Sequence, residues 1–322
     1  MLPPTLRDQP LPAAYWYLWA GMLINRLGHF VVPFLALYLT EERHLPVAQV
    51  GLVVSLYGAG GLLAAPLGGV CADRFGRRGT TLLGMALSAV SLLVLGATSA
   101  LPAVAIATFS LGFLGDLARP AVYATVADVV PPAARARAYG LLSWAINLGF
   151  AVSPVVAGVA SARSFALLFW ADAATTLACA GIIWRFVPES RPAAQSPPTW
   201  EGYLAPYRDR IFVPFVGLIF MTTLLFYQCT MALPLDMRAH GIGARAYGVL
   251  IALNGAIIVV LQPLASRALE RFARPHVLAA GALLTGLGMG LTALAHSAEG
   301  YAGCIALWTL GEIALAPVGS AV

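Results

Sequence analysis

Ten long apolar stretches determine what this chain can fold into. Each has about 20 residues, which is the length of a helix that crosses a hydrocarbon layer of about 30 Å. Continuous apolar runs in lipid indicate helices rather than a closed barrel, whose strands alternate. We therefore predict an all-α polytopic membrane protein, with spans at 13–40, 47–71, 79–98, 101–127, 138–160, 164–187, 211–236, 244–266, 275–296 and 298–322.

Composition agrees with this class. Only 10% of the 322 residues are charged, whereas a soluble domain has roughly 25%. The chain therefore lacks the polar side chains that a water-facing surface needs. All 19 basic residues are arginine, and together with 32 glycines this predicts a GC-rich, bacterial gene.

The distribution of arginines predicts the orientation in the membrane. With the N-terminus inside, 13 arginines fall on inside segments and four on outside segments (Arg43, Arg163, Arg238 and Arg245), while Arg26 and Arg119 lie within spans. Arginine on short loops marks the cytoplasmic side. We expect a multi-pass protein of the inner cell membrane with a cytoplasmic N-terminus, and the net charge of +5 to face anionic lipid rather than nucleic acid.

An internal repeat appears at an offset of 197 residues. Without gaps, residues 50–84 align with residues 247–281, and both copies contain an acid followed by Arg-Phe-x-Arg. Six spans separate the copies, so the copies have the same orientation, as in transporters built from parallel repeats. We predict an N-terminal six-helix bundle at 1–187, a cytoplasmic linker at 188–210 and a four-span C-terminal bundle at 211–322.

The loop after the second predicted span carries a family resemblance. Its pattern, Gly69-x-x-x-Asp73-Arg74-x-Gly76-Arg77-Arg78, resembles the signature loop of the major facilitator superfamily. The resemblance implies two parallel-related helix bundles, of which the second is incomplete here. We expect the loop to act as a conformational latch in which Arg77 reaches Asp128 at the inner end of the fourth span.

A second motif resembles that of twelve-span bacterial drug–proton antiporters. In the fifth span, Gly149-x-x-x-Ser153-Pro154-x-x-Ala157-Gly158 resembles their glycine–proline motif, with Ser153 and Ala157 in place of two glycines. Thr108 occupies the position of the family's arginine in the fourth span. The family has twelve spans and this chain ends in the tenth, so we expect either a fragment of a longer product or a chain with altered function.

Charged side chains within spans are the main candidates for function, because each is costly in lipid. Asp116 and Arg119 share one helix face, either as a structural ion pair or as a proton site that the arginine tunes. Glu312 is the second candidate proton carrier. Arg26 needs an anion, which is a carboxylate of another span or an acidic substrate. We expect Asp172 to be structural.

Several polar and aromatic residues at middle depth are candidates for a substrate cavity, although ordinary packing explains each one alone. They are His29, Tyr123, Trp144, Asn147, Tyr227, Gln228 and Asn254.

Together these features predict a secondary transporter that exports small organic molecules or drugs in exchange for protons by alternating access. An importer or symporter of an organic solute, for example an anion paired with Arg26, is one alternative, and a non-transporting fragment is another. The sequence has no P-loop and no nucleophile–base or metal-ligand constellation, so we predict no enzyme activity, cofactor or metal. The expected partners of the monomer are a small-molecule substrate, protons and the lipid bilayer.

Overall fold

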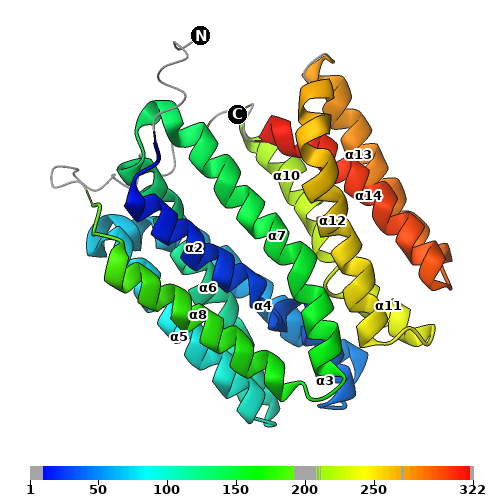
Figure 1. The fold of residues 1–322 in the computed structure, drawn as a ribbon. Coiled ribbons are helices and arrows are strands. Elements are labelled where there is room, and N and C mark those ends of the chain that lie inside the picture. Colours follow the sequence, from blue (N-terminus) through cyan, green and yellow to red (C-terminus); the bar gives the residue numbers. More distant parts are fainter. Residues whose placement is uncertain (1–9, 192–207, 209, 211, 270–271, 320–322) are drawn as a thin grey trace. The chain divides into compact units, whose positions relative to one another are not determined.

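The structure is a computed structural model in which every regular element of the described residues is a helix (Figure 1). It describes residues 10–191, 208, 210, 212–269 and 272–319. The α-helices are α2 (Ala13–Leu27), α3 (Val31–Glu41), α4 (Val47–Phe75), α5 (Arg77–Ala97), α6 (Leu101–Val129), α7 (Arg135–Ser161), α8 (Ala166–Phe186), α10 (Phe212–Tyr227), α11 (Ala232–Ala239), α12 (Ala244–Leu269), α13 (Arg274–Leu291) and α14 (Ala298–Gly319). Two short 3₁₀ helices, η1 (Pro132–Ala134) and η3 (Thr292–Leu294), complete the list.

The helices form two compact units. Unit 1 contains Met1–Ser153 and Arg163–Pro197, and unit 2 contains Pro154–Ala162 and Pro198–Val322. Helix α7 therefore begins in unit 1 and ends in unit 2. Most of the predicted linker, at 192–207 and 209, lies outside the described residues.

Eight of the ten predicted spans correspond to helices of the described chain that are long and apolar enough to cross a membrane. The predicted span 13–40 is one of these eight, and the two predicted spans that are not among them are 211–236 and 298–322. Within 13–40 the helix is interrupted between α2 and α3, and within 211–236 between α10 and α11. The predicted spans did not include these interruptions.

The internal repeat is present in the helices themselves. Helices α4, α5 and α6 begin at Val47, Arg77 and Leu101, and α12, α13 and α14 begin at residues 244, 274 and 298. Each start is displaced by 197 residues, as the sequence alignment predicts. Glu270 and Arg271, in the second copy of the loop motif, lie outside the described residues.

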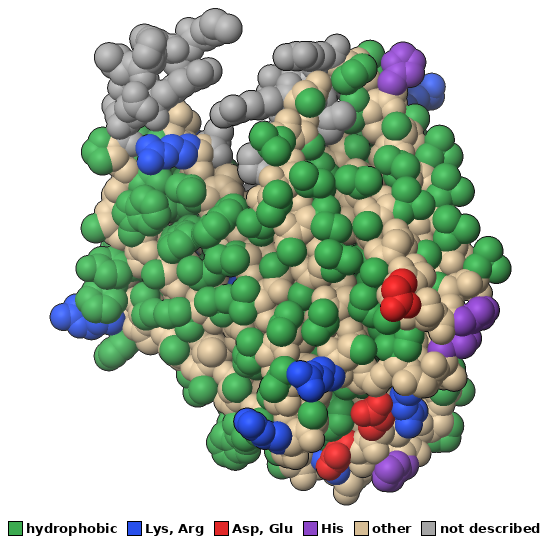
Figure 2. All heavy atoms as spheres, turned by 45° about the vertical axis from the view of Figure 1, so that its right-hand side comes forward, with side chains coloured by type: hydrophobic (Ala, Val, Ile, Leu, Met, Phe, Trp, Pro, Cys, Tyr) green, Lys and Arg blue, Asp and Glu red, His purple; other side chains and the backbone are tan. Residues whose placement is uncertain are grey.

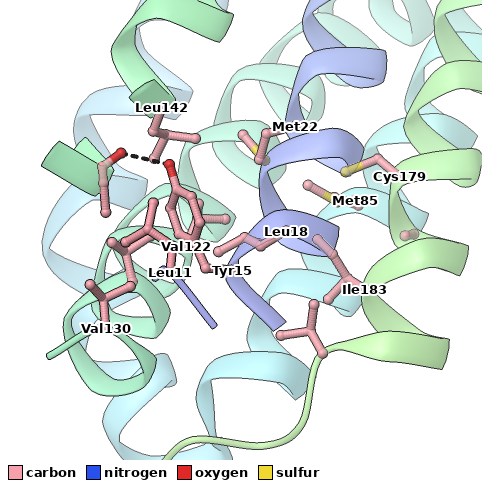
Figure 3. Packing of buried hydrophobic residues seen from close by; sticks show 14 of the residues in the cluster. Leu11, Tyr15, Leu18, Met22, Met85, Val122, Val130, Leu142, Cys179 and Ile183 are labelled. Atoms are coloured by element: carbon pink, nitrogen blue, oxygen red, sulfur yellow. Dashed lines mark hydrogen bonds between the residues drawn. The ribbon is translucent and has the colours of Figure 1, made fainter. Parts of the chain in front are cut away.

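Unit 1 has a continuous apolar core around Tyr15 of α2. The Tyr15 ring is fully buried, and its hydroxyl donates a 2.8 Å hydrogen bond to the carbonyl oxygen of Ala138 in α7. Figure 3 shows the cluster to which this ring belongs, with Leu18 and Met22 of the same helix and Ile183 of α8. A buried phenol requires such a partner, so this contact ties α2 to α7.

Apolar side chains also cover much of the surface. Figure 2 shows one face on which apolar side chains are widespread and charged ones are scattered. Exposed apolar residues of the structure include Leu62 at 70%, Trp170 at 66% and Leu283 at 65%. Such a surface would aggregate in water but is stable against lipid tails.

Candidate functional site

The interruption of the first span is held by a buried carboxylate. Asp172 of α8 is 2% exposed, and its Oδ2 atom accepts hydrogen bonds of 3.1 Å from the backbone N–H groups of Phe30 and Val31. These N–H groups lie at the start of α3 and have no partner within the helix. A carboxylate at this end is also favoured by the helix dipole. Asp172 thus stabilises the break, in keeping with a structural role.

The residues of the break are tied to neighbouring helices. Asn25 Nδ2 donates to Thr176 Oγ1 in α8 at 2.9 Å, and Ser153 Oγ of α7 donates to the carbonyl oxygen of His29 at 3.2 Å. The break is therefore part of the packing of unit 1 rather than a frayed end.

Arg26 lies at this break with an unsatisfied donor. Its Nε atom is buried and has no hydrogen-bond partner, and no carboxylate of the described residues forms an ion pair with its side chain. Gly149 of α7 lies against its backbone, where a Cβ atom would come 2.7 Å from the Arg26 carbonyl oxygen. The Asp172 carboxylate is close enough to interact with Arg26 electrostatically but forms no ion pair with it, so the guanidinium group can still attract a further anion.

Asp116 and Arg119 come together only loosely on α6. Arg119 Nη1 lies 3.8 Å from Asp116 Oδ1, and the two side chains are 60% and 36% exposed respectively. The Asp116 carboxylate lies over Gly61 of α4, where a Cβ atom would collide with it. The pair is partly exposed within unit 1 and close to the upper limit of ion-pair distance, so the two charges hold each other only weakly.

Glu312 lies in a different environment in unit 2. Its Oε2 atom accepts a 2.9 Å hydrogen bond from Asn254 Nδ2 of α12, and the same nitrogen donates at 2.9 Å to Thr309 Oγ1. Asn254 is 1% exposed and Thr309 is fully buried. No arginine of the described residues forms an ion pair with Glu312. Glu312 is thus a partly buried carboxyl group, and the hydrogen bond that the described residues give it comes from a neutral amide.

The remaining cavity candidates lie on partly exposed surfaces. Tyr123 stacks on Tyr139 with 5.8 Å between ring centroids, and Trp144 stacks on Trp19 at 6.4 Å. The three others lie on two separate parts of the described chain: Asn147 is half-buried on α7, Tyr227 ends α10, and the Gln228 amide donates to Leu224 O at 3.3 Å.

The loop between α4 and α5 forms a compact charge cluster. Arg77, 7% exposed, donates to Asp73 through Nη1 and to Asp128 Oδ2 through Nε at 3.3 Å. The contact between Arg77 and Asp128 that the sequence predicts is therefore present. Gly76 has φ of 94°, a left-handed conformation that favours glycine, whereas a Cβ atom on Gly69 would meet nothing within 4 Å.

The two other arginines of this loop also contact the end of the first unit's last helix and the residues after it. The Arg78 guanidinium donates to the carbonyl oxygen of Trp184 near the end of α8. The backbone carbonyl oxygen of Arg74 accepts a 2.7 Å bond from Arg191 Nη1. The first contact ties the loop to α8, and the second ties it to the segment that follows α8.

Glu189 is the residue of this cluster that sequence reasoning missed. Its carboxylate accepts hydrogen bonds from the backbone N–H groups of Arg77 at 2.8 Å and Arg78 at 3.1 Å, and thus caps α5. Burial alone would raise the pKa of Glu189, but these bonds, with those from Arg191 and Gly79, lower it below its ordinary value. The available signal was an acid directly after the sixth span, on the side predicted to carry the loop.

The antiporter-like motif of α7 forms close helix contacts within each unit. Gly149 lies against α2 in unit 1, as described above. In unit 2, a Cβ atom on Gly158 would lie 3.1 Å from the carbonyl oxygen of Ala244, and one on Gly248 of α12 would collide with the carbonyl oxygen of Pro154. Small residues permit such approach in membrane proteins, so the motif here brings α7 close to α2 and α12.

Known proteins share both the sequence pattern and the fold. A family model described as Major Facilitator Superfamily matches residues 18–322. The multidrug resistance protein MdtH of Klebsiella pneumoniae (strain 342) is 25% identical over 305 residues, covering 94% of this chain and 76% of that protein. A Na(+), Li(+), K(+)/H(+) antiporter of Planococcus maritimus is 25% identical over 304 residues, covering 83% and 71% respectively.

Among solved structures, the nucleoside transporter NupG (D323A mutant) superposes with a TM-score of 0.77, at 14% identity, over 96% of this chain and 82% of that one. This likeness concerns the fold alone.

Proposed function

Because the chain belongs to the major facilitator superfamily, and is thus a multi-pass membrane transporter of a small solute rather than an enzyme, we propose that it exports small organic molecules in exchange for protons. In this proposal, the bundles 1–187 and 211–322 alternate in access to the two sides of the membrane. The linker 188–210 lies on the cytoplasmic side, as does the N-terminus, and the monomer is the transporting unit.

The observation that carries the proposal is the environment of Glu312. Glu312 is a half-buried carboxyl group within a membrane span, and without a cationic partner among the described residues such a group is costly when ionised. Its one hydrogen bond, from Asn254, leaves it able to gain a proton when water is excluded and lose one when water enters. That exchange is what coupling to a proton gradient requires. Asp116, loosely paired with Arg119, is the second proposed carrier.

Export rather than import is supported by the relatives. One is named a multidrug resistance protein and one a cation/proton antiporter. The antiporter-like motif of α7 agrees with both names. Tyr123, Trp144 and Asn147, from unit 1, and Tyr227 and Gln228, from unit 2, are the proposed contacts of the substrate.

The charge cluster of Asp73, Arg77 and Asp128 is proposed as the latch of one conformational state. Three charged side chains and the Glu189 cap meet at one end of α5. Separating them exposes each charge to a new partner or to water, so the cluster can stabilise the state in which it is closed.

A second candidate function is import of an organic anion. The unpaired Nε atom of Arg26 favours it, because a guanidinium group at mid-span binds carboxylate groups well. In that case Arg26 would contact the substrate directly, and Glu312 would carry a proton in the same direction.

Transport in proteoliposomes with an internal pH dye tests the proposal, using a lipophilic cationic dye and benzoate as separate probes. Export predicts opposite movement of the cationic dye and protons, abolished by Glu312→Gln and reduced at least tenfold by Asp116→Asn. The matched control is Glu299→Gln, because Glu299 is exposed in the first turn of the same helix α14.

Coupled movement that survives in the Glu312→Gln, Asp116→Asn double variant contradicts the assignment of the proton carriers. Movement of benzoate with protons, lost in Arg26→Gln, supports the second candidate instead.

A further inference from the structure

The amide of Asn254 is oriented in an unusual way for a buried side chain. Its nitrogen donates both hydrogens, one to Glu312 Oε2 and one to Thr309 Oγ1, each over 2.9 Å. Its oxygen, Oδ1, is buried and has no hydrogen-bond partner among the described residues. An unpaired buried acceptor costs about 1–3 kcal/mol, so this arrangement calls for an explanation.

The arrangement suits one protonation state of Glu312. An ionised carboxylate accepts hydrogen bonds only, so it requires a donor such as Asn254 Nδ2. A protonated carboxyl group instead has an O–H to donate, and an amide nitrogen cannot accept it. The same side chain carries an acceptor that has no hydrogen-bond partner among the described residues, Asn254 Oδ1.

Turning the amide by 180° about its last torsion exchanges the two atoms. The oxygen would then occupy the nitrogen's position and accept from the Glu312 O–H. Thr309 fits both arrangements, because its hydroxyl now donates to the carbonyl oxygen of Ile305 at 2.6 Å and accepts from Asn254. After the turn it can donate to Asn254 instead, so both contacts reverse direction without moving a helix.

We propose that Asn254 is a positioning residue that reverses its amide when Glu312 takes up a proton, and so gives each protonation state of Glu312 its own hydrogen bond. This inference rests on the proposed role of Glu312 as a proton carrier. The amide links α12 to α14, so the protonation of a side chain on one helix changes a contact with another. The sequence pattern alone placed Asn254 among cavity residues and did not connect it with Glu312.

Other titratable groups near this site are few. Cys229, at the end of α10, is close enough to Glu312 to interact with it electrostatically, and the hydroxyl of Tyr247 on α12 donates to the Cys229 carbonyl oxygen at 3.0 Å. Neither is charged at neutral pH in its ordinary form. Of the described groups that face this site, Glu312 is therefore the one whose protonation changes the hydrogen bond required of Asn254.

The test uses infrared difference spectroscopy on the full chain in lipid, titrated with pH. The carboxylic acid band of Glu312 is identified by its loss in Glu312→Gln. Asparagine labelled with ¹³C at the side-chain carbonyl reports the amide, and the chain has only three asparagines, so Asn254 is identified by its loss in Asn254→Leu.

The expected result is that the Asn254 carbonyl band shifts at the same pH midpoint as the Glu312 band. In Asn254→Leu, which has similar size but no amide, the Glu312 midpoint moves at least one unit to higher pH, because the ionised form loses its donor. Asn254→Gln restores at least half of this shift. Thr285→Val is the matched control, because the buried Thr285 hydroxyl donates within its own helix α13, to Gly281 O at 2.9 Å. It should leave the midpoint within 0.3 units of the parent, a tolerance of about twofold in proton affinity.

Two outcomes overturn this inference and leave the proposed function intact. In the first, the Glu312 midpoint in folded Asn254→Leu stays within 0.3 units of the parent. In the second, the Asn254 band does not respond while Glu312 titrates. An acidic band that persists unchanged in Glu312→Gln shows that Glu312 does not titrate, and it overturns the proposed proton carrier itself.

Discussion

Helices α4–α6 and α12–α14 are two copies of one design that make their central contact in different ways. In the first copy, a Cβ atom on Gly112 would collide with the carbonyl oxygen of Tyr57, so α4 and α6 meet backbone to backbone. At the equivalent positions of the second copy, 197 residues on, Asn254 donates a hydrogen bond to Thr309. A polar pair therefore replaces direct backbone contact.

Another contact is the same in both copies. A Cβ atom on Gly84 would lie 2.8 Å from Leu114 O and 3.0 Å from Ala118 Cβ, and one on Gly281 would lie 3.0 Å from both the equivalent carbonyl oxygen and Leu315 Cγ. The packing of α5 on α6 is thus repeated in α13 on α14. The copies share their scaffold and differ where the polar chemistry lies.

The position of the acid differs correspondingly. The residue equivalent to Glu312 is Gly115, and the acid of the first copy, Asp116, is one residue further along. One residue is about 100° around a helix, which places Asp116 over Gly61 and leaves it 36% exposed. Glu312 instead faces the polar pair. Equivalent helix pairs in the two copies therefore differ in their carboxylates: Asp116 is loosely held in the first copy, and Glu312 is more tightly held in the second.

The largest effect is expected from breaking the backbone contact of the first copy. Gly112→Ala places a methyl group against the Tyr57 carbonyl oxygen and should lower the free energy of unfolding by about 3 kcal/mol, the upper part of the range for overpacking. Gly115→Ala is the matched control, since its Cβ would lie 3.9 Å from Ser88 Oγ. Equilibrium unfolding in mixed micelles measures both, and equal effects of the two would refute the close contact.

The interrupted first helices of the two units give the next contrast. Asp172→Leu leaves the backbone N–H of Val31 without its acceptor, while that of Phe30 keeps its bond to Gly28 O, and should cost about 2 kcal/mol. Asp172→Asn keeps an acceptor oxygen and should cost less than half of that. In unit 2, Tyr247→Phe removes the donor to Cys229 O and should cost about 1 kcal/mol. Thermal unfolding of the three variants tests this order, which fails if Leu and Asn at 172 are equivalent.

Matched threonines separate a bonded hydroxyl from an unbonded one. Thr309→Val removes the acceptor for Asn254 and should cost about 0.6 kcal/mol, the average for such bonds in membrane proteins. Thr108→Val should be neutral or stabilising, because its buried hydroxyl oxygen has no hydrogen-bond partner among the described residues. Opposite signs in the same unfolding assay confirm the contrast, and a loss at Thr108 larger than that at Thr309 contradicts it.

The smallest effect concerns the cap of α5. Glu189→Gln should lower stability by about 0.5 kcal/mol at neutral pH, because a negative charge at a helix start is favourable. The pKa of Glu189 is lower in the folded protein than its ordinary value of 4.5. Its contribution is therefore complete above about pH 4.5 and is lost as pH falls through the folded pKa.

Melting temperatures of the parent and Glu189→Gln, measured from pH 7 down to pH 3, test this dependence. The difference between them should shrink toward zero at the acidic end. A difference that grows on acidification would show that Glu189 does not cap the helix as a carboxylate.

Sequence reasoning predicted the helices and the repeat because both follow from composition and periodicity along the chain. The starts of α12, α13 and α14 follow from the first copy in this way. It could not predict the break after Leu27, because Asp172, which stabilises it, lies more than 140 residues away. The link between Asn254 and Glu312 was missed for the same reason, since the spacing of two residues on separate helices does not reveal which side chains face each other.

The turn at Gly76 has a mechanical consequence. Helix α4 ends at Phe75 and α5 begins at Arg77, so a single residue, with φ of 94°, connects two helices of 29 and 21 residues. Such a joint has no slack to lengthen, and its carboxylate cap holds the first turn of α5 in place. A change in the tilt of one helix therefore changes the tilt of the other, with Gly76 as the hinge between them.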